Sequence, residues 1–166
     1  MDYRIEKKDA FQIICRRKQV THPQGETAAA DISDFWKECT GDGTIQALTD
    51  FLPKEPALKG VLGISFTRDM EGLQFPYGIG AEYNGLPVRD ERFEVIEIPA
   101  YTYAVFPCKG PMPDAFTRVY RQICTEFFPQ SGYEYGYGVE LEVYPSADVK
   151  NPNYTCEIWI AVNEKK

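Results

Sequence analysis

Strict alternation of apolar and polar residues predicts a half-buried β-strand near the C-terminus. In the segment ELEVYP, Glu140, Glu142 and Tyr144 alternate with apolar residues. One face of such a strand packs in the core, and the other faces water or a ligand. Two carboxylates beside a tyrosine suit a cationic or hydrogen-bonding small ligand. An ordinary strand with its polar side in water has the same spacing, so the pattern alone leaves both interpretations open.

Two stretches have helical periodicity instead. In the first, Asp31 or Ser33 is the expected cap, and the helix breaks at the GDG segment, residues 41–43. The second is expected to begin at Asp114 and to end before Pro129. The apolar residues that recur at helical spacing are Ile32, Phe35, Trp36 and Cys39 in the first, and Phe116, Val119, Tyr120, Ile123, Cys124 and Phe127 in the second.

The remaining apolar segments predict strands. They cover residues 3–18, 60–67, 75–83, 92–106 (interrupted by Pro99) and 154–162, in addition to ELEVYP. The order strand, helix, strand, strand therefore occurs twice, which indicates an internal duplication. We expect a single α+β domain over residues 1–166, with one module over about 1–86 and a second over about 92–163. Their strands would form a mostly antiparallel sheet with the helices on one face, and a ligand would bind on the open face or at the seam between the modules.

Composition excludes several classes of protein. The 166 residues carry a formal net charge of −7 without a basic run, which disfavours direct binding to nucleic acid. Five cysteines without a CxxC pair argue against a disulfide framework and a zinc site. No apolar run is long enough to cross a membrane, and the N-terminus lacks the pattern of a secretory signal. We expect a soluble cytoplasmic protein that needs no metal and no cofactor.

Other catalytic and binding motifs have little support. His22 is the only histidine and falls in a predicted turn beside Pro23, so a histidine-based triad or metal site is disfavoured. Cys108 lies near Lys109, but without a histidine partner it is expected to be a small buried residue. The glycines of GIGAEYNG lie on a predicted hairpin and do not precede a helix, so they do not indicate a nucleotide-binding loop.

One family is similar to this sequence in the order and spacing of its motifs. The runs AYTYAVFPCKGPMPDAF and RQICTEFFPQSGYEY, followed by VELEVYPSADVKNPNYTCEIWIAV, resemble the GyrI-like small-molecule-binding domain. This domain is also the effector-binding half of many AraC-type and MerR-type transcription regulators. The resemblance covers residues 96–162 well and is looser in the first half, where it rests on FWKEC and YGIGAEY. Because the sequence begins at the first predicted strand, we expect no helix-turn-helix module like that of those regulators.

The resemblance implies a duplicated fold with a central ligand cleft. By motif position, Glu142 is implied to be the central acid that contacts the ligand, and Glu140 a rim or solvent position. Glu82 matches an acidic position of the family but has the opposite strand parity to Tyr77, so only one of these two can face the cleft of a regular strand. The aromatic residues implied to line the cleft are Trp36, Tyr77 and Trp159, and further Tyr103, Phe106 and Tyr144.

Three functions fit this resemblance. The first is binding of small lipophilic or aromatic cations for multidrug-type sensing or sequestration, with Glu142 neutralising the cation. The second is hydrolysis of electrophilic natural-product toxins, in which Glu142 would act with Tyr77 or with Glu82 as the catalytic pair. The third is inhibition of DNA gyrase, which would require a protein partner. The sequence favours the first and leaves the others open.

Overall fold

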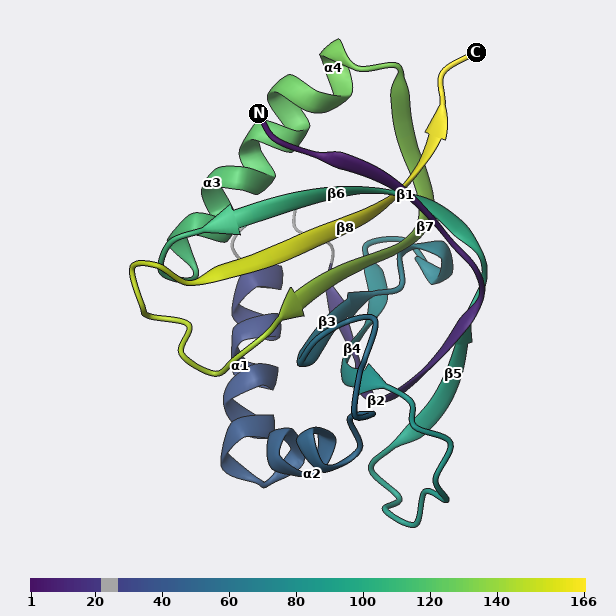
Figure 1. Cartoon of the computed structure of the whole chain (residues 1–166), viewed down its shortest axis with the longest axis vertical. Helices are drawn as coiled ribbons and strands as arrows, with labels where there is room; N and C mark the ends of the chain where they lie inside the picture. Colours follow the sequence, from purple (N-terminus) through teal and green to yellow (C-terminus); the bar gives the residue numbers. More distant parts are fainter. Residues whose placement is uncertain (22–26) are drawn as a thin grey trace.

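The computed structural model describes residues 1–21 and 27–166, and within them eight strands form one antiparallel sheet (Figure 1). The order across the sheet is β1-β6-β8-β7-β3-β4-β2-β5. His22 and the turn predicted around it lie outside the described residues. The strands are β1 (Arg4–Lys8), β2 (Phe11–Thr21), β3 (Val61–Ser65), β4 (Gln74–Glu82), β5 (Glu94–Ile98), β6 (Tyr101–Lys109), β7 (Tyr133–Tyr144) and β8 (Thr155–Glu164).

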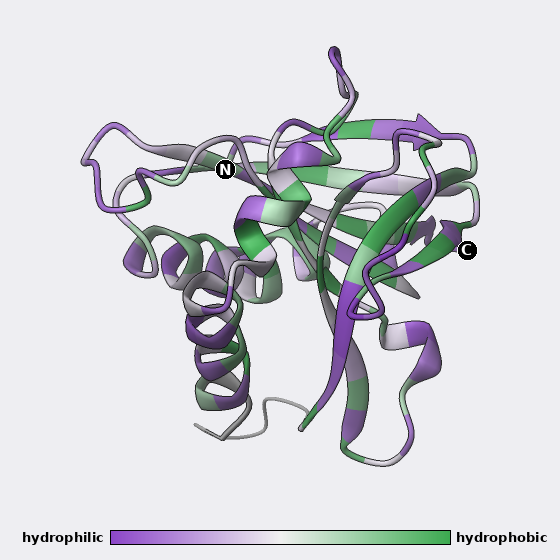
Figure 2. Ribbon diagram, turned by 90° about the horizontal axis from the view of Figure 1, so that it is seen from below, coloured by the Kyte–Doolittle hydropathy of each residue, from purple (hydrophilic) through white to green (hydrophobic). Residues whose placement is uncertain are grey.

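The helices lie on one side of this sheet, as Figure 2 shows at right angles to Figure 1. The predicted α+β fold, with an antiparallel sheet and helices on one face, is confirmed. In the first half these elements are α1 (Thr27–Gly41), α2 (Thr44–Asp50) and the short 3₁₀ turn η1 (Thr67–Asp69). In the second half, α3 (Asp114–Gln122) continues through a π-helical turn, η2 (Ile123–Phe127), into α4 (Phe128–Gln130).

The sheet bends where two long segments of the chain are interrupted at the same level. One segment consists of β1 and β2, the other of β5 and β6, and the two segments pair with each other on both sides of the interruption. Lys8 pairs with Tyr101 where β1 meets β6, and Phe11 pairs with Ile98 where β2 meets β5. Both chains therefore keep the same register across the break. Pro99 lies at the bend in one of them, where it cannot donate a backbone hydrogen bond. The two edge strands of the sheet, β1 and β5, therefore lie at opposite ends of this bent ladder, and the two halves of the sheet fold toward each other.

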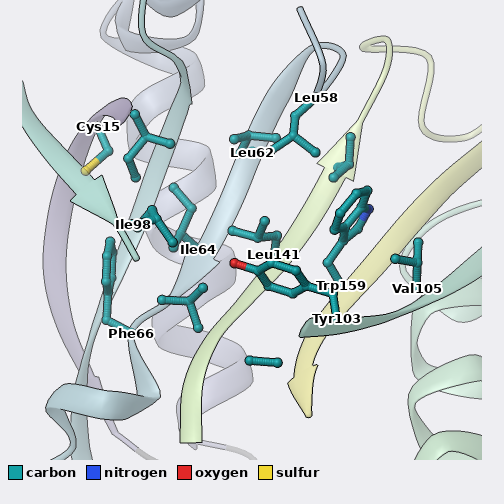
Figure 3. Close-up of a cluster of buried hydrophobic side chains, with 14 residues drawn as sticks. Cys15, Leu58, Leu62, Ile64, Phe66, Ile98, Tyr103, Val105, Leu141 and Trp159 are labelled. Carbon is teal, nitrogen blue, oxygen red and sulfur yellow. The ribbon is translucent and has the colours of Figure 1, made fainter. Parts of the chain in front are cut away.

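The core divides into three clusters. One lies on the sheet face away from the helices and joins both halves of the sheet; its members include Cys15, Leu62, Leu141 and Trp159 (Figure 3). The second packs α3 and η2 on β6 and β8, and the third packs α1 and α2 on β2 and β4. The apolar stripes predicted for both helices thus face the sheet, except for Cys124 in the π-helical turn, which is exposed.

Two details of the predicted helices are wrong. α1 already begins at Thr27, so Asp31 and Ser33 lie within the helix and do not cap it. The Asp31 carboxylate instead accepts a hydrogen bond from the backbone N–H of Thr21 at 3.4 Å. Pro129 does not follow the end of the second helix but lies in the first turn of α4, where the missing N–H of a proline is tolerated.

All five cysteines are free thiols, and four of them are buried. Cys108 is fully buried, as predicted, and lies opposite Cys156 in the ladder between β6 and β8. Burial raises the pKa of the Cys15 thiol to about 12, so this side chain packs as an uncharged apolar group. Within the described part of the chain, none of the helices has the length and apolar character needed to cross a bilayer.

Candidate functional site: a tyrosine-bound carboxylate on β7

The two halves of the sheet, β1-β6-β8-β7 and β3-β4-β2-β5, meet where β7 pairs with β3. Glu142 lies opposite Gly63 in this ladder, and Tyr144 lies opposite Val61. Glu140, Glu142 and Tyr144 alternate with residues of the core cluster in Figure 3, so they project from the other face of β7, toward the helices. We call these three residues the helix-side face of β7.

Glu142 is held by hydroxyl groups from both halves of the chain. Tyr77 on β4 donates to Glu142 Oε2 at 2.8 Å, and Tyr144 donates to Glu142 Oε1 at 2.5 Å. The indole N–H of Trp36 on α1 donates in turn to Tyr77 Oη at 2.9 Å. The Trp36 and Tyr144 rings pack edge to face, with centroids 5.3 Å apart. The Glu142 carboxylate is therefore surrounded by a buried tyrosine, a half-buried tyrosine and a half-buried tryptophan.

Gly63 makes this arrangement possible. A Cβ atom on Gly63 would lie 2.4 Å from Tyr77 Oη and 2.7 Å from Glu142 Oε2. Both contacts are too short for real atoms, so a side chain here would push the hydroxyl and the carboxylate apart. The missing side chain in β3 therefore provides the space in which the two modules share their hydrogen bond.

Burial, two hydrogen bonds and one neighbouring charge act on the pKa of Glu142. Burial raises the pKa of Glu142, the hydrogen bonds from Tyr144 and Tyr77 lower it, and the nearby charge of Glu140 raises it again. Among the residues that the structure describes, no lysine or arginine forms an ion pair with Glu142. Burial also raises the pKa of Tyr77 and of Tyr144 well above its usual range, so both hydroxyls stay protonated and donate.

Comparison with known proteins places this chain in a family. The sequence matches the family of integron-associated effector-binding proteins, Cass2, over residues 4–162. The chain belongs to this family. The predicted GyrI-like relationship is thereby confirmed. A search among proteins of curated function finds no relative of the sequence.

Solved structures share the fold of this Cass2-family chain. SAV2435, in a structure bound to tetraphenylphosphonium, has a TM-score of 0.84 at 21% identity, covering 98% of this chain and 94% of that chain. A chain of the EcmrR–DNA complex has a TM-score of 0.63 at 16% identity, covering 99% of this chain and 58% of that chain. A hydrolase from Listeria innocua has a TM-score of 0.54 at 13% identity, covering 97% and 91%. At these identities the likeness shows the fold alone.

Two predicted cleft residues lie on the opposite face of the sheet from Glu142. Trp159 pairs with Leu141 and packs against Tyr103, with ring centroids 5.5 Å apart (Figure 3). Both belong to the core cluster that faces away from the helices. The prediction that these two residues lie beside Glu142 is wrong, because Trp159 shares its face of the sheet with Leu141 and not with Glu142.

Phe106 and Glu82 are also separated from the carboxylate. Phe106 is fully buried beneath η2, where its ring packs against Phe127 at 4.9 Å. Glu82 points away from the helices and accepts the backbone N–H of Leu58 at 3.0 Å. Because β4 is regular, Tyr77 is the residue of this strand that faces Glu142 and Glu82 is not. Of the predicted residues, the structure brings together Glu142, Tyr77, Tyr144 and Trp36.

The family resemblance implied a rim or solvent position for a second carboxylate, Glu140. It is half-buried and accepts hydrogen bonds from Tyr120 at 3.0 Å and from Tyr135 at 2.7 Å. Alternation along ELEVYP placed it on the same face as Glu142, but its tyrosines come from α3 and from the irregular start of β7. In the described residues no three His, Cys, Asp or Glu side chains gather into a metal-binding group.

Proposed function

We propose that this protein binds small lipophilic or aromatic cations at Glu142, for sensing or sequestration of such compounds. The observation that carries the proposal is the setting of Glu142, a half-buried carboxylate held by two tyrosine hydroxyls without an ion-pair partner among the described residues. A charge in such a place costs free energy unless an opposite charge accompanies it. A cationic ligand supplies that charge.

The neighbouring rings favour a cation that is apolar on its outside. Trp36 and Tyr144 offer aromatic surface, and each cation–π contact contributes about 0.5–2 kcal/mol. The tyrosine hydroxyls already occupy both oxygens of Glu142, so the ligand needs charge and apolar area more than hydrogen-bond donors. Tetraphenylphosphonium has these properties, and the structurally similar SAV2435 is bound to it.

Binding requires the aromatic side chains to part. Trp36 and Tyr144 pack against each other, and Tyr144 donates directly to the carboxylate. Two cavities of this structure, of about 270 and 340 Å³, lie elsewhere, against α3, and are lined among others by Lys109, Arg118 and Arg121. A cation therefore enters by displacing the Trp36 indole or the Tyr144 ring, which makes Trp36 fluorescence a direct reporter.

The test is a titration with tetraphenylphosphonium, followed by Trp36 fluorescence. Trp159→Phe removes the only other tryptophan and leaves Trp36 as the reporter. We expect saturable quenching in this background and a loss of affinity of at least tenfold on adding Glu142→Gln. Glu97→Gln, which removes the same charge from an exposed position on β5, should leave the affinity unchanged. Triphenylphosphine oxide, a neutral analogue, should not bind. Absence of saturable quenching, or equal affinity in Glu142→Gln, would contradict the proposal.

A second candidate function is hydrolysis of electrophilic natural-product toxins. It is favoured by the raised pKa of Glu142, together with the short hydrogen bond from Tyr144, because a carboxyl group titrating nearer neutrality can act as a general acid or base. Turnover of a strained cyclopropane or epoxide substrate that is lost in Glu142→Gln would support it. Saturable binding of the same compounds without turnover would exclude them as substrates and favour the first function.

A further inference from the structure

We propose that Cys108 and Cys156 form a redox switch, in which oxidation joins the two thiols in a disulfide and lowers the affinity of the Glu142 site for cations. The inference concerns two side chains that take no part in holding a cation at Glu142. The change of affinity rests on the proposed function, whereas the formation of the disulfide does not.

The two cysteines lie directly opposite each other on neighbouring strands. Cys108 on β6 pairs with Cys156 on β8 in the antiparallel ladder, and both side chains are fully buried. Both belong to the core cluster that packs against α3, so they leave the sheet on the same face. Opposite residues of an antiparallel pair have Cα atoms about 4.5–5.5 Å apart, which lies within the range that a disulfide spans. The backbone therefore already holds both side chains in position for a bond between their sulfur atoms.

The two thiols also interact with each other. The pKa of Cys156 is raised, first by its hydrogen bond with the Cys108 thiol and then by burial. The other three cysteines lie apart from this pair and from one another. Cys15 and Cys39 belong to the two other core clusters, and Cys124 is exposed on η2. Among the cysteines of this chain, Cys108 and Cys156 are thus the two that are placed to join.

An oxidant reaches this pair through the end of the ladder. Lys109 and Thr155 are the last residues that pair between β6 and β8, so the cysteines lie one position from the end. The connection from β7 to β8, residues 145–154, forms a loop at this end of the sheet (Figure 1). The backbone N–H of Met112 donates to the carbonyl of Val149 at 2.8 Å and ties the loop down. Strand ends and loops open locally at a low cost in free energy, and such opening admits a small neutral oxidant such as hydrogen peroxide.

The oxidation balances with hydrogen peroxide as its co-reactant. One thiol loses its proton, and its sulfur attacks an oxygen of the peroxide, so that the O–O bond breaks, hydroxide leaves and a sulfenic acid forms. The second thiol attacks this sulfur, the S–O bond breaks, and water leaves as the S–S bond forms. In total the two thiols give up two protons and two electrons, and one peroxide molecule becomes two molecules of water. A dithiol reductant reverses the change by thiol–disulfide exchange.

Cys156 connects the pair to the binding site. Val143 pairs with Glu157 in the ladder of β7 and β8, so the next residues along, Tyr144 and Cys156, are neighbours on the helix-side face. The Tyr144 ring packs against the cluster that contains both cysteines. This ring is one of the two aromatic groups that part when a cation binds at Glu142, and β8 yields with it more easily while its end is held by hydrogen bonds alone. A disulfide to β6 removes this freedom, so the oxidised protein binds the cation more weakly.

Mass spectrometry and cation titration test the switch in a background in which Cys124→Ser removes the exposed thiol. Hydrogen peroxide should yield an intramolecular disulfide, seen as the loss of two hydrogen atoms from the mass and as one cross-linked peptide that contains Cys108 and Cys156. Dithiothreitol should reverse it. In isothermal titration calorimetry, tetraphenylphosphonium affinity should be lower by about fivefold or more in the oxidised protein than in the reduced protein.

Two variants serve as a matched pair, because each removes one fully buried thiol. Cys108→Ala should prevent the cross-link and make tetraphenylphosphonium affinity independent of peroxide treatment. Cys15→Ala should preserve both the cross-link and the loss of affinity. Circular dichroism verifies that each variant is folded, and the comparison of oxidised with reduced protein needs neither variant.

The outcomes separate the switch from the proposed function. If peroxide produces no disulfide between Cys108 and Cys156, the switch is wrong whatever the protein binds. If the disulfide forms but the oxidised and reduced proteins bind tetraphenylphosphonium equally well, the pair does not regulate the site and the switch is again wrong. If the reduced protein does not bind tetraphenylphosphonium at all, the proposed function is wrong, and the mass measurement still decides whether the disulfide forms.

Discussion

Tyr77 and Glu142 form a 2.8 Å hydrogen bond although they belong to different modules of the chain. Tyr77 lies on β4 and Glu142 on β7, and β3 lies between these two strands in the sheet. The two side chains therefore meet across β3. Gly63 on β3 leaves the space for this contact. Neither half of the sheet alone therefore contains the complete carboxylate cluster.

Removing single hydroxyls tests whether this network stabilises the fold. Tyr77→Phe deletes the donor to Glu142 and the acceptor for Trp36, so we expect the free energy of unfolding to fall by about 1–3 kcal/mol. Tyr103→Phe is the matched control, because the Tyr103 hydroxyl is equally buried but has no hydrogen-bond partner in the described structure. Its removal should be neutral or stabilising. Urea unfolding measures both, and equal losses in the two variants would contradict the role given to Tyr77.

Gly63→Ala tests the space between the modules. Its Cβ would collide with Tyr77 Oη and Glu142 Oε2, so the carboxylate must move. We expect a loss of about 1–3 kcal/mol in stability, as for other overpacked sites, and a loss of at least tenfold in tetraphenylphosphonium affinity. Gly41→Ala is the control, because nothing lies within 4 Å of its Cβ position. Unchanged affinity in Gly63→Ala would indicate that the ligand does not need this geometry.

The raised pKa of Glu142 predicts a pH dependence of both binding and stability. Only the carboxylate form attracts a cation, so tetraphenylphosphonium affinity should fall roughly tenfold per pH unit below the pKa of Glu142 in the folded protein. For stability the sign is reversed. The folded state binds this proton more tightly than the unfolded state, so the contribution of Glu142 is favourable below its unfolded pKa and is lost as the pH rises through its folded pKa.

The difference between the protein and Glu142→Gln isolates this effect. The variant should be about as stable as the parent near pH 4 and more stable near pH 8, when compared by thermal unfolding. The comparison is needed because other carboxylates act in the opposite direction, as at Asp42, whose pKa hydrogen bonds from Thr44 and Arg16 lower to about 2. A stability difference that is constant with pH would contradict the assignment of the raised pKa to Glu142.

Periodicity predicted the faces of the strands but not their neighbours. Alternation in ELEVYP placed Glu142 opposite the core, and the stripe from Phe116 to Phe127 placed α3 on the sheet. Both follow from local geometry. The position of Trp159 could not follow from it, because its face relative to Glu142 depends on the pairing of Trp159 with Leu141. A register between distant strands leaves no periodic signal in one sequence.

The environment of Glu140 was missed for a related reason. The register of β7 against β8 shifts between Tyr135 and Glu140, and Tyr137 within this bulge has a φ of 50°. The irregularity allows the hydroxyl of Tyr135 to reach Glu140 in spite of their odd separation. Simple alternation would have put Tyr135 and Glu140 on opposite faces. The glycines in SGYEYGYG were the available signal, because glycine within a strand often marks a bulge.

Glu82→Gln distinguishes the two strand faces that the sequence left open. The Glu82 carboxylate accepts the backbone N–H of Leu58 on the side away from Glu142, so its loss should weaken that hydrogen bond. A hydrogen bond to a charged acceptor contributes about 1.5–3 kcal/mol, of which the neutral amide oxygen keeps a part, and we expect the free energy of unfolding to fall by about 1 kcal/mol. Tetraphenylphosphonium affinity should be unchanged, whereas Tyr77→Phe should weaken it. Isothermal titration calorimetry of the two variants decides between the faces. A loss of affinity in Glu82→Gln equal to that in Tyr77→Phe would mean that the ligand contacts the other face of β4.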